Sequence, residues 1–310
     1  MAAFVPPDVL VLAGGGVLGE AWMTGVLAGV EDAAGLDLRR TESFVGTSAG
    51  AIVAAALAAG RSPRRPSQAR DAPGAGDVAS PGDARSRGSV VRGGLRAAGA
   101  WGWAATAPAA GAALALGAPG GALVRSALLA RMPSDGRRLD RLHADVERSG
   151  ARFDGRLRVC CVDRGSGRRV VFGAPGAPRA SVADAVVASC AIPWAFAPVT
   201  IGGREYVDGG VWSVTNLDVA PAGRDTRVLC LDTIAGLDER ARRSMAALRA
   251  AFRVAAVLET QQLRRRGARV QHVAPDREAA AAIGGDVMDA APRARVLAAG
   301  YRQGRALATG

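Results

Sequence analysis

Residues 9–19 read VLVLAGGGVLG, and this stretch decides the fold. Val9 to Leu12 is an apolar run of strand length, and the glycine cluster Gly14-Gly15-Gly16 follows it at once. From about Gly19 to Ala34 the pattern becomes helical. A strand, a glycine turn and a helix in immediate succession make one unit of an α/β sheet.

A second unit of the same kind follows. Phe44 and Val45 end a short strand, residues 46–50 read GTSAG, and residues 51–59 are helical until Gly60 stops the helix. Strands that alternate with helices imply a parallel sheet.

The rest of the chain continues the mixture of helices and strands. Helices are expected at 137–149, at 182–188 and from near Glu239 to Arg269. Strands are expected at 157–162 and 170–172, as a hairpin, then ending at Tyr206 and Val207, and at 228–231 and 270–273. With 49% hydrophobic residues, residues 1–310 are expected to form a single domain.

Two stretches interrupt this pattern. Residues 61–94 are rich in Pro, Ser, Gly, Arg and Asp, and we expect them to form a flexible insertion. Residues 95–136 contain a long uncharged run of mostly Ala and Gly, which we interpret as a lid or interfacial segment. A membrane-spanning helix would be richer in Leu, Ile and Phe, and a buried helical pair remains the other interpretation.

Charge and cysteine content limit the functions to consider. All 40 basic residues are arginine and the formal net charge is +12. We interpret this as a solvated arginine surface and expect no specific nucleic-acid partner. The four cysteines form no CxxC pair and lie far from both histidines, so no metal site is expected. The N-terminus lacks the basic region of a signal peptide, which favours a cytoplasmic location, with peripheral contact to a membrane as a further option.

Three motifs carry the chemistry. Gly46-Thr47-Ser48-Ala49-Gly50 matches the turn G-x-S-x-G, in which a serine hydroxyl is exposed between a strand and a helix. The unhindered amides of Gly14, Gly15 and Gly16 can bind a developing oxyanion near Ser48. Asp208-Gly209-Gly210 follows a strand end, where a carboxylate can project into a cleft.

The same glycine loop also fits the dinucleotide pattern G-x-G-x-x-G. That interpretation requires an acidic residue at the end of the second strand, where this chain instead runs into the serine turn. We therefore favour the oxyanion interpretation, and no cofactor is expected.

In this order, the three motifs resemble those of the patatin-like phospholipases. Ser189-Cys190-Ala191-Ile192-Pro193 is similar to that family's Ser-x-Ala-x-Pro segment, and Asn216 follows at a familiar distance. The resemblance implies a three-layer α/β/α fold with a mostly parallel central sheet and a variable cap insertion. It also implies a catalytic dyad of Ser48 and Asp208 without histidine, an oxyanion loop at Gly14, Gly15 and Gly16, and a lipid or acyl-ester substrate.

Other functions stay open at this stage. Ser48, Asp208 and His272 stand in the chain order of an α/β-hydrolase triad, which would supply a conventional histidine base. The chain could instead be a non-catalytic lipid-binding protein. An acyltransferase would use the same residues as a hydrolase and differ only in what attacks the acyl-enzyme.

Overall fold

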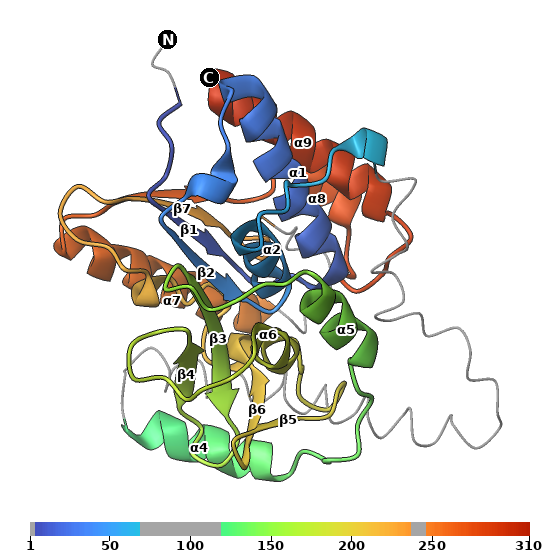
Figure 1. The fold of residues 1–310 in the computed structure, drawn as a ribbon, viewed down its shortest axis with the longest axis vertical. Coiled ribbons are helices and arrows are strands. Elements are labelled where there is room, and N and C mark those ends of the chain that lie inside the picture. Colours follow the sequence, from blue (N-terminus) through green and yellow to red (C-terminus); the bar gives the residue numbers. More distant parts are fainter. Residues whose placement is uncertain (1–3, 69–118, 237–245) are drawn as a thin grey trace.

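In the computed structural model, which describes residues 4–68, 119–236 and 246–310, the predicted strands lie in one eight-stranded sheet, together with Val199–Ile201, which was not predicted (Figure 1). Its order is β5-β6-β3-β2-β1-β7-β8, with β4 also paired to β3. The pairs among β3, β2, β1, β7 and β8 are parallel, whereas β4, β5 and β6 pair antiparallel. The strands are β1 (Val9–Leu12), β2 (Ser43–Thr47), β3 (Leu157–Asp163), β4 (Arg169–Phe172), β5 (Val199–Ile201), β6 (Arg204–Asp208), β7 (Arg227–Leu231) and β8 (Arg269–Val273).

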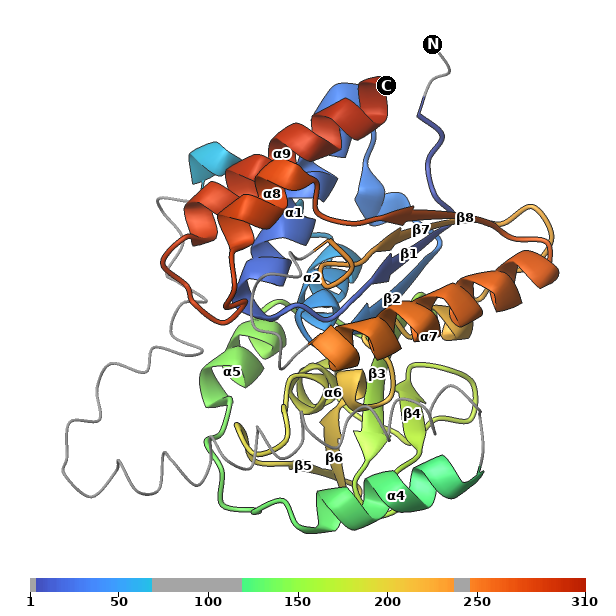
Figure 2. The same ribbon diagram turned by 180° about the vertical axis from the view of Figure 1, so that it is seen from behind.

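Helices cover both faces of this sheet, which gives the three predicted layers (Figures 1 and 2). One face carries α1, α2, α5, α6, α8 and α9, and the other carries α7. The helices are α1 (Gly16–Ala34), α2 (Ala49–Ala58), α4 (Pro119–Ala130), α5 (Asp140–Arg148), α6 (Val182–Ser189), α7 (Ala246–Arg265), α8 (Arg277–Ile283) and α9 (Arg293–Thr309). Short 3-10 helices lie at Leu38–Arg40, Pro66–Gln68, Gly209–Val211 and Leu217–Val219.

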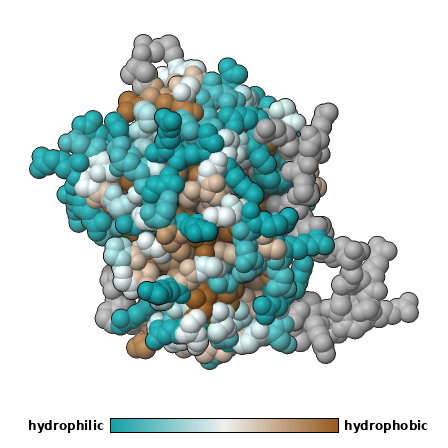
Figure 3. All heavy atoms as spheres, viewed as in Figure 1, coloured by the Kyte–Doolittle hydropathy of each residue, from teal (hydrophilic) through white to brown (hydrophobic). Residues whose placement is uncertain are grey.

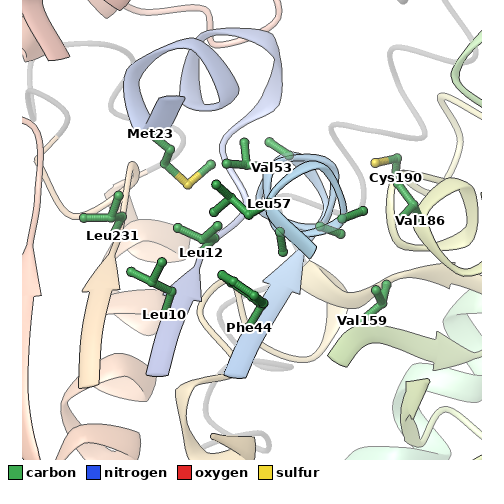
Figure 4. Packing of buried hydrophobic residues seen from close by; sticks show 14 of the residues in the cluster. Leu10, Leu12, Met23, Phe44, Val53, Leu57, Val159, Val186, Cys190 and Leu231 are labelled. Carbon is green, nitrogen blue, oxygen red and sulfur yellow. The ribbon is translucent and has the colours of Figure 1, made fainter. Parts of the chain in front are cut away.

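The strand sequences are apolar on both sides because both sides are covered. Leu10, Leu12 and Phe44 pack under α1 and α2, as Figure 4 shows. Val9 and Val11 belong to a separate buried cluster on the face of α7. Near-continuous apolar runs are the expected signature of parallel strands buried on two faces.

The helices α8 and α9 were not predicted from the sequence. The helix α9 lies along α1, where a Cβ added to Gly29 would come within 2.1 Å of the Tyr301 carbonyl oxygen. Trp22 Nε1 donates a hydrogen bond of 2.8 Å to Gln303 of α9. Because glycine and alanine rather than leucine form much of this contact, the α9 sequence shows no obvious apolar stripe.

Two predicted helix ends are corrected by the structure. The helix that was predicted to reach Arg269 ends at Arg265, because Gly267 adopts φ 87° and Arg269 already belongs to β8. The helix predicted at 137–149 begins at Asp140, since Arg137 forms a β-bridge with Phe196. The predicted start near Glu239 lies outside the described residues.

The two predicted insertions are described only in part. Of residues 61–94, the structure describes 61–68, where Arg64 pairs with Glu20 and Arg65 pairs with Glu31 of α1. Of residues 95–136, it describes the portion from Pro119, which forms α4. Among the described residues, no helix has both the length and the apolar content to cross a bilayer.

Candidate active site

Ser48 occupies a sharp turn between β2 and α2. Its backbone has φ 51° and ψ −120°, a combination that non-glycine residues rarely adopt and that is typically retained at functional sites. The turn is also crowded, because a Cβ added to Gly50 would come within 1.9 Å of the Leu12 carbonyl oxygen. The glycine that ends the G-x-S-x-G motif is therefore required for β1 and α2 to pack closely.

Ser189 holds this turn from the neighbouring helix α6. The backbone N–H of Ser48 donates to Ser189 Oγ at 2.9 Å, and the Ser189 hydroxyl donates to the Cys160 carbonyl oxygen at 2.7 Å. Ser189 is fully buried, so it links the turn to β3 without water. The sequence placed Ser189 in a family motif but gave no sign of this role.

Asp208 reaches Ser48 because two strands meet end to end along one edge of β3. Cys160 and Cys161 both pair with β4 on the other edge. On the edge of β3 that faces away from β4, Thr47 at the end of β2 pairs with Cys160, and Asp208 at the end of β6 pairs with Cys161. Since β2 runs parallel and β6 antiparallel to β3, their carboxyl ends point at each other.

The Asp208 carboxyl is buried in this junction, with 5% of the residue exposed. Burial raises its pKa and outweighs the hydrogen bonds from the Gly210 N–H and the Ser48 hydroxyl, which lower it, so that the pKa is about 6. The Gly210 N–H lies 2.7 Å from Asp208 Oδ1. A carboxylate with a raised pKa is a stronger base than a solvated one.

The predicted oxyanion loop lies on the other side of Ser48. A Cβ on Gly14 would sit 3.6 Å from Ser48 Cβ, but the Gly14 N–H already donates to the Val214 carbonyl oxygen at 2.9 Å. The N–H groups of Gly15 and Gly16 find no acceptor among residues 4–68, 119–236 and 246–310. Gly16, with φ 62°, opens α1, whose N-terminal end carries partial positive charge. The oxyanion role of the three glycines stays a prediction.

Asn216 ties the segment after Asp208 to β2. Its Nδ2 donates to Thr47 Oγ1 at 3.1 Å and to the Ser213 carbonyl oxygen at 2.5 Å. Its Oδ1 accepts from Arg169, which also pairs with both oxygens of Asp218 at 2.6 Å. These contacts hold Thr47, the residue next to Ser48, in place. Neither Arg169 nor Asp218 was predicted from the sequence to take part in the site.

Neither histidine joins Ser48 and Asp208. His272 lies on β8, three strands away from β2 and about 14 Å at the usual strand spacing, where its Nε2 is 3.8 Å from Asp232. His143 Nε2 lies 3.0 Å from Asp184 Oδ1, between α5 and α6. The three-residue arrangement of an α/β-hydrolase triad is therefore not formed at Ser48.

Figure 3 shows hydrophobic residues at the surface in the region where Figure 1 places β3, β6 and α6. In the described part of the chain, no group of three or more His, Cys, Asp or Glu side chains could hold a metal ion.

The sequence profile of the Patatin-like phospholipase family matches residues 10–221, which include Ser48, Asp208 and the glycine loop. A search of curated proteins finds no significant sequence match.

Two solved structures resemble the fold. VipD from Legionella pneumophila superposes with a TM-score of 0.49 at 16% identity, covering 98% of this chain and 67% of VipD. The type III effector ExoU gives a TM-score of 0.39 at 16% identity, covering 98% of this chain and 53% of ExoU. On the family match over residues 10–221, the chain belongs to the patatin-like phospholipase family and is a lipid acyl hydrolase acting on ester bonds.

Proposed function

We propose that the protein cleaves fatty-acyl esters of phospholipids or neutral lipids through a dyad of Ser48 and Asp208. One observation carries this proposal: the strained Ser48 turn and the buried Asp208 carboxyl meet where β2 and β6 end against β3. The Ser48 hydroxyl contributes a hydrogen bond that lowers the pKa of Asp208, as expected when the two groups are neighbours.

The proposed reaction has two steps. Ser48 Oγ attacks the ester carbonyl carbon while Asp208 accepts the hydroxyl proton, and the tetrahedral intermediate collapses to an acyl-serine. Asp208 returns that proton to the leaving alkoxide, which departs as the alcohol. A water molecule then attacks the acyl-serine, with Asp208 again accepting the proton. The second tetrahedral intermediate collapses by breaking the bond to Ser48 Oγ, which takes the proton back from Asp208, and the fatty acid is released.

Backbone amides stabilise the negative charge in both steps. The N–H groups of Gly15 and Gly16 have no acceptor among the described residues, and they open α1 beside Ser48. Amides that are held in place before the reaction need no reorganisation when the oxyanion forms. Burial of Asp208 serves the same end, because a water-free carboxylate accepts a proton more readily.

The proposal is tested with a short-chain p-nitrophenyl ester and a fluorophosphonate probe. The wild-type protein should hydrolyse the ester and be labelled on Ser48, whereas Ser48→Ala should lose both. Asp208→Ala should lose hydrolysis while keeping its fold. A wild-type protein that neither hydrolyses nor is labelled would overturn the proposal and favour a non-catalytic lipid-binding role.

The two histidines provide the control for the dyad. His143→Ala and His272→Ala should each retain hydrolysis, because neither side chain reaches Ser48 or Asp208. Loss of activity in His272→Ala alone, with the fold intact, would replace the dyad by a triad. A panel of phospholipids and neutral lipids then identifies the head group.

A further inference from the structure

The helix α7 exposes apolar side chains on the face that points away from the protein. Val254, Val257 and Leu258 are 50%, 54% and 43% exposed. Their spacing of three and four residues places them side by side on one helical face. An ordinary surface helix carries charged or polar residues there, so this face needs an explanation.

The opposite face of α7 is firmly attached to the protein. Ala256, Glu259 and Leu263 are buried, and they lie about 100° or more around the helix from the exposed stripe. Glu259 accepts hydrogen bonds from the Thr215 hydroxyl at 2.5 Å and from the Leu217 N–H at 2.8 Å. The helix is thus fixed in orientation, and the exposed stripe is a constant feature of the surface.

The stripe lies at the middle of α7, whose first residues are at the end of the sheet that carries Ser48. The helix α7 follows β7 and precedes the parallel strand β8, so it begins at the carboxyl ends of the strands and runs back (Figure 2). Val254 lies in the first half of this helix, and Val257 and Leu258 lie just past its middle. Glu259 also anchors α7 to the 215–217 segment, whose Asn216 is hydrogen-bonded to Thr47 next to Ser48.

Three arginines follow the apolar stripe at the carboxyl end of the helix. Arg264, Arg265 and Arg266 are all exposed, and Arg265 follows Leu258 at seven residues on nearly the same face. Apolar side chains that enter the acyl layer, with arginines that reach the head groups, suit the surface of an anionic bilayer. A soluble protein partner would require a complementary apolar surface but gives no reason for the neighbouring arginines.

We propose that Val254, Val257 and Leu258 form a docking surface for a lipid bilayer that contains anionic lipid. The surface brings Ser48 close to the membrane in which an acyl ester would reside, so its purpose rests on the function proposed above. Binding is nevertheless independent of hydrolysis and is measured without it.

The test is flotation of the full chain with vesicles of phosphatidylcholine, alone or with phosphatidylglycerol at about one third. The triple variant carries Val254→Glu, Val257→Glu and Leu258→Glu. Because glutamate is a good helix former and these positions are exposed, the helix should still form. Val124→Glu is the matched control, because Val124 is 46% exposed but lies on α4 rather than on α7. Arg265→Glu tests whether the positive charge at this position contributes to binding of anionic vesicles.

The wild type and Val124→Glu should bind the anionic vesicles, and the triple variant should bind at least about tenfold more weakly. Arg265→Glu should weaken binding to anionic vesicles and leave binding to neutral vesicles unchanged. Every variant should hydrolyse a soluble p-nitrophenyl ester as the wild type does, which separates docking from catalysis. Wild-type vesicle binding by the triple variant, or no vesicle binding by the wild type, would overturn the proposal. A dimeric wild type together with a monomeric triple variant would also overturn the proposal, because the stripe would then be a contact between two copies of the protein.

Discussion

At the scale of single residues, the decisive feature is the carboxyl of Asp208. It is buried where β2 and β6 meet, and burial raises its pKa to about 6. A group with this pKa is ionised at neutral pH yet is a far better base than an exposed aspartate. The residue thus combines the two properties that the proposed dyad requires.

The pH dependence of hydrolysis follows from this value. Since Asp208 accepts a proton only when ionised, kcat/KM for a p-nitrophenyl ester should rise with pH through a single ionisation at about 6. His143→Ala and His272→Ala should show the same profile, which excludes histidine as the titrating group. A profile that stays flat between about pH 5 and pH 8 would contradict Asp208 as the base.

The same carboxyl makes folding stability depend on pH. Its pKa is higher in the folded state than the 3.8 of an ordinary aspartate, so its contribution to stability is full below about pH 4 and is lost as the pH rises through about 6. Asp208→Asn, which cannot ionise, should therefore be more stable than wild type at about pH 8, by up to about 3 kcal/mol. Urea unfolding at about pH 4 and pH 8 measures this, and an equal gain at both would show that burial of charge is not the cause.

At the scale of secondary-structure elements, the sequence predicted every strand of the described sheet except β5, but it did not predict how the strands are arranged. The apolar runs and glycine turns at Val9–Leu12 and at residues 46–50 predicted β1, β2 and the helices that follow them to within about three residues. Asp208 was predicted at a strand end, and that is confirmed. The antiparallel direction of β6 and its position beyond β2 could not be predicted, because strand direction depends on pairing with the distant strand β3.

Close packing of α1 on α9 gives a prediction at this scale. Gly29→Ala should destabilise the protein by about 3 kcal/mol or more, although alanine is the better helix former, because the new Cβ would lie 2.1 Å from the Tyr301 carbonyl oxygen. Gly223→Ala is the control, since its Cβ would meet nothing within 4 Å. Thermal unfolding of both variants measures the difference, and similar melting temperatures would refute the close contact.

At the scale of the whole molecule, the last helix completes the layer over the first. Trp22, Val26 and Leu27 of α1 are fully buried. The helix α9 contributes to this burial, and Gln303 satisfies the indole N–H of Trp22. The two ends of the chain are thus joined in one core, although the sequence pattern of residues 293–309 did not predict that helix.

Removal of α9 should therefore unfold the domain rather than trim it. A chain that ends at Ala291 would expose the face of α1 that contacts α9, and we expect it to aggregate or lose its helical circular dichroism. Such a loss would occur although Ser48, Asp208 and the glycine loop all remain. A soluble, active truncated protein would show that α1 is stable without its partner.

The sequence alone determined the local structure and the chemical types at the site: the strand-turn-helix units, a serine on a crowded turn, a glycine loop and a carboxylate at a strand end. These follow from patterns of neighbouring residues, which depend on backbone geometry and local packing. Only the tertiary structure decided that Ser48 and Asp208 meet, that Ser189 and Asn216 hold the parts together, and that both histidines lie elsewhere. Those facts depend on pairing between segments far apart in the chain, and no local pattern encodes such pairing.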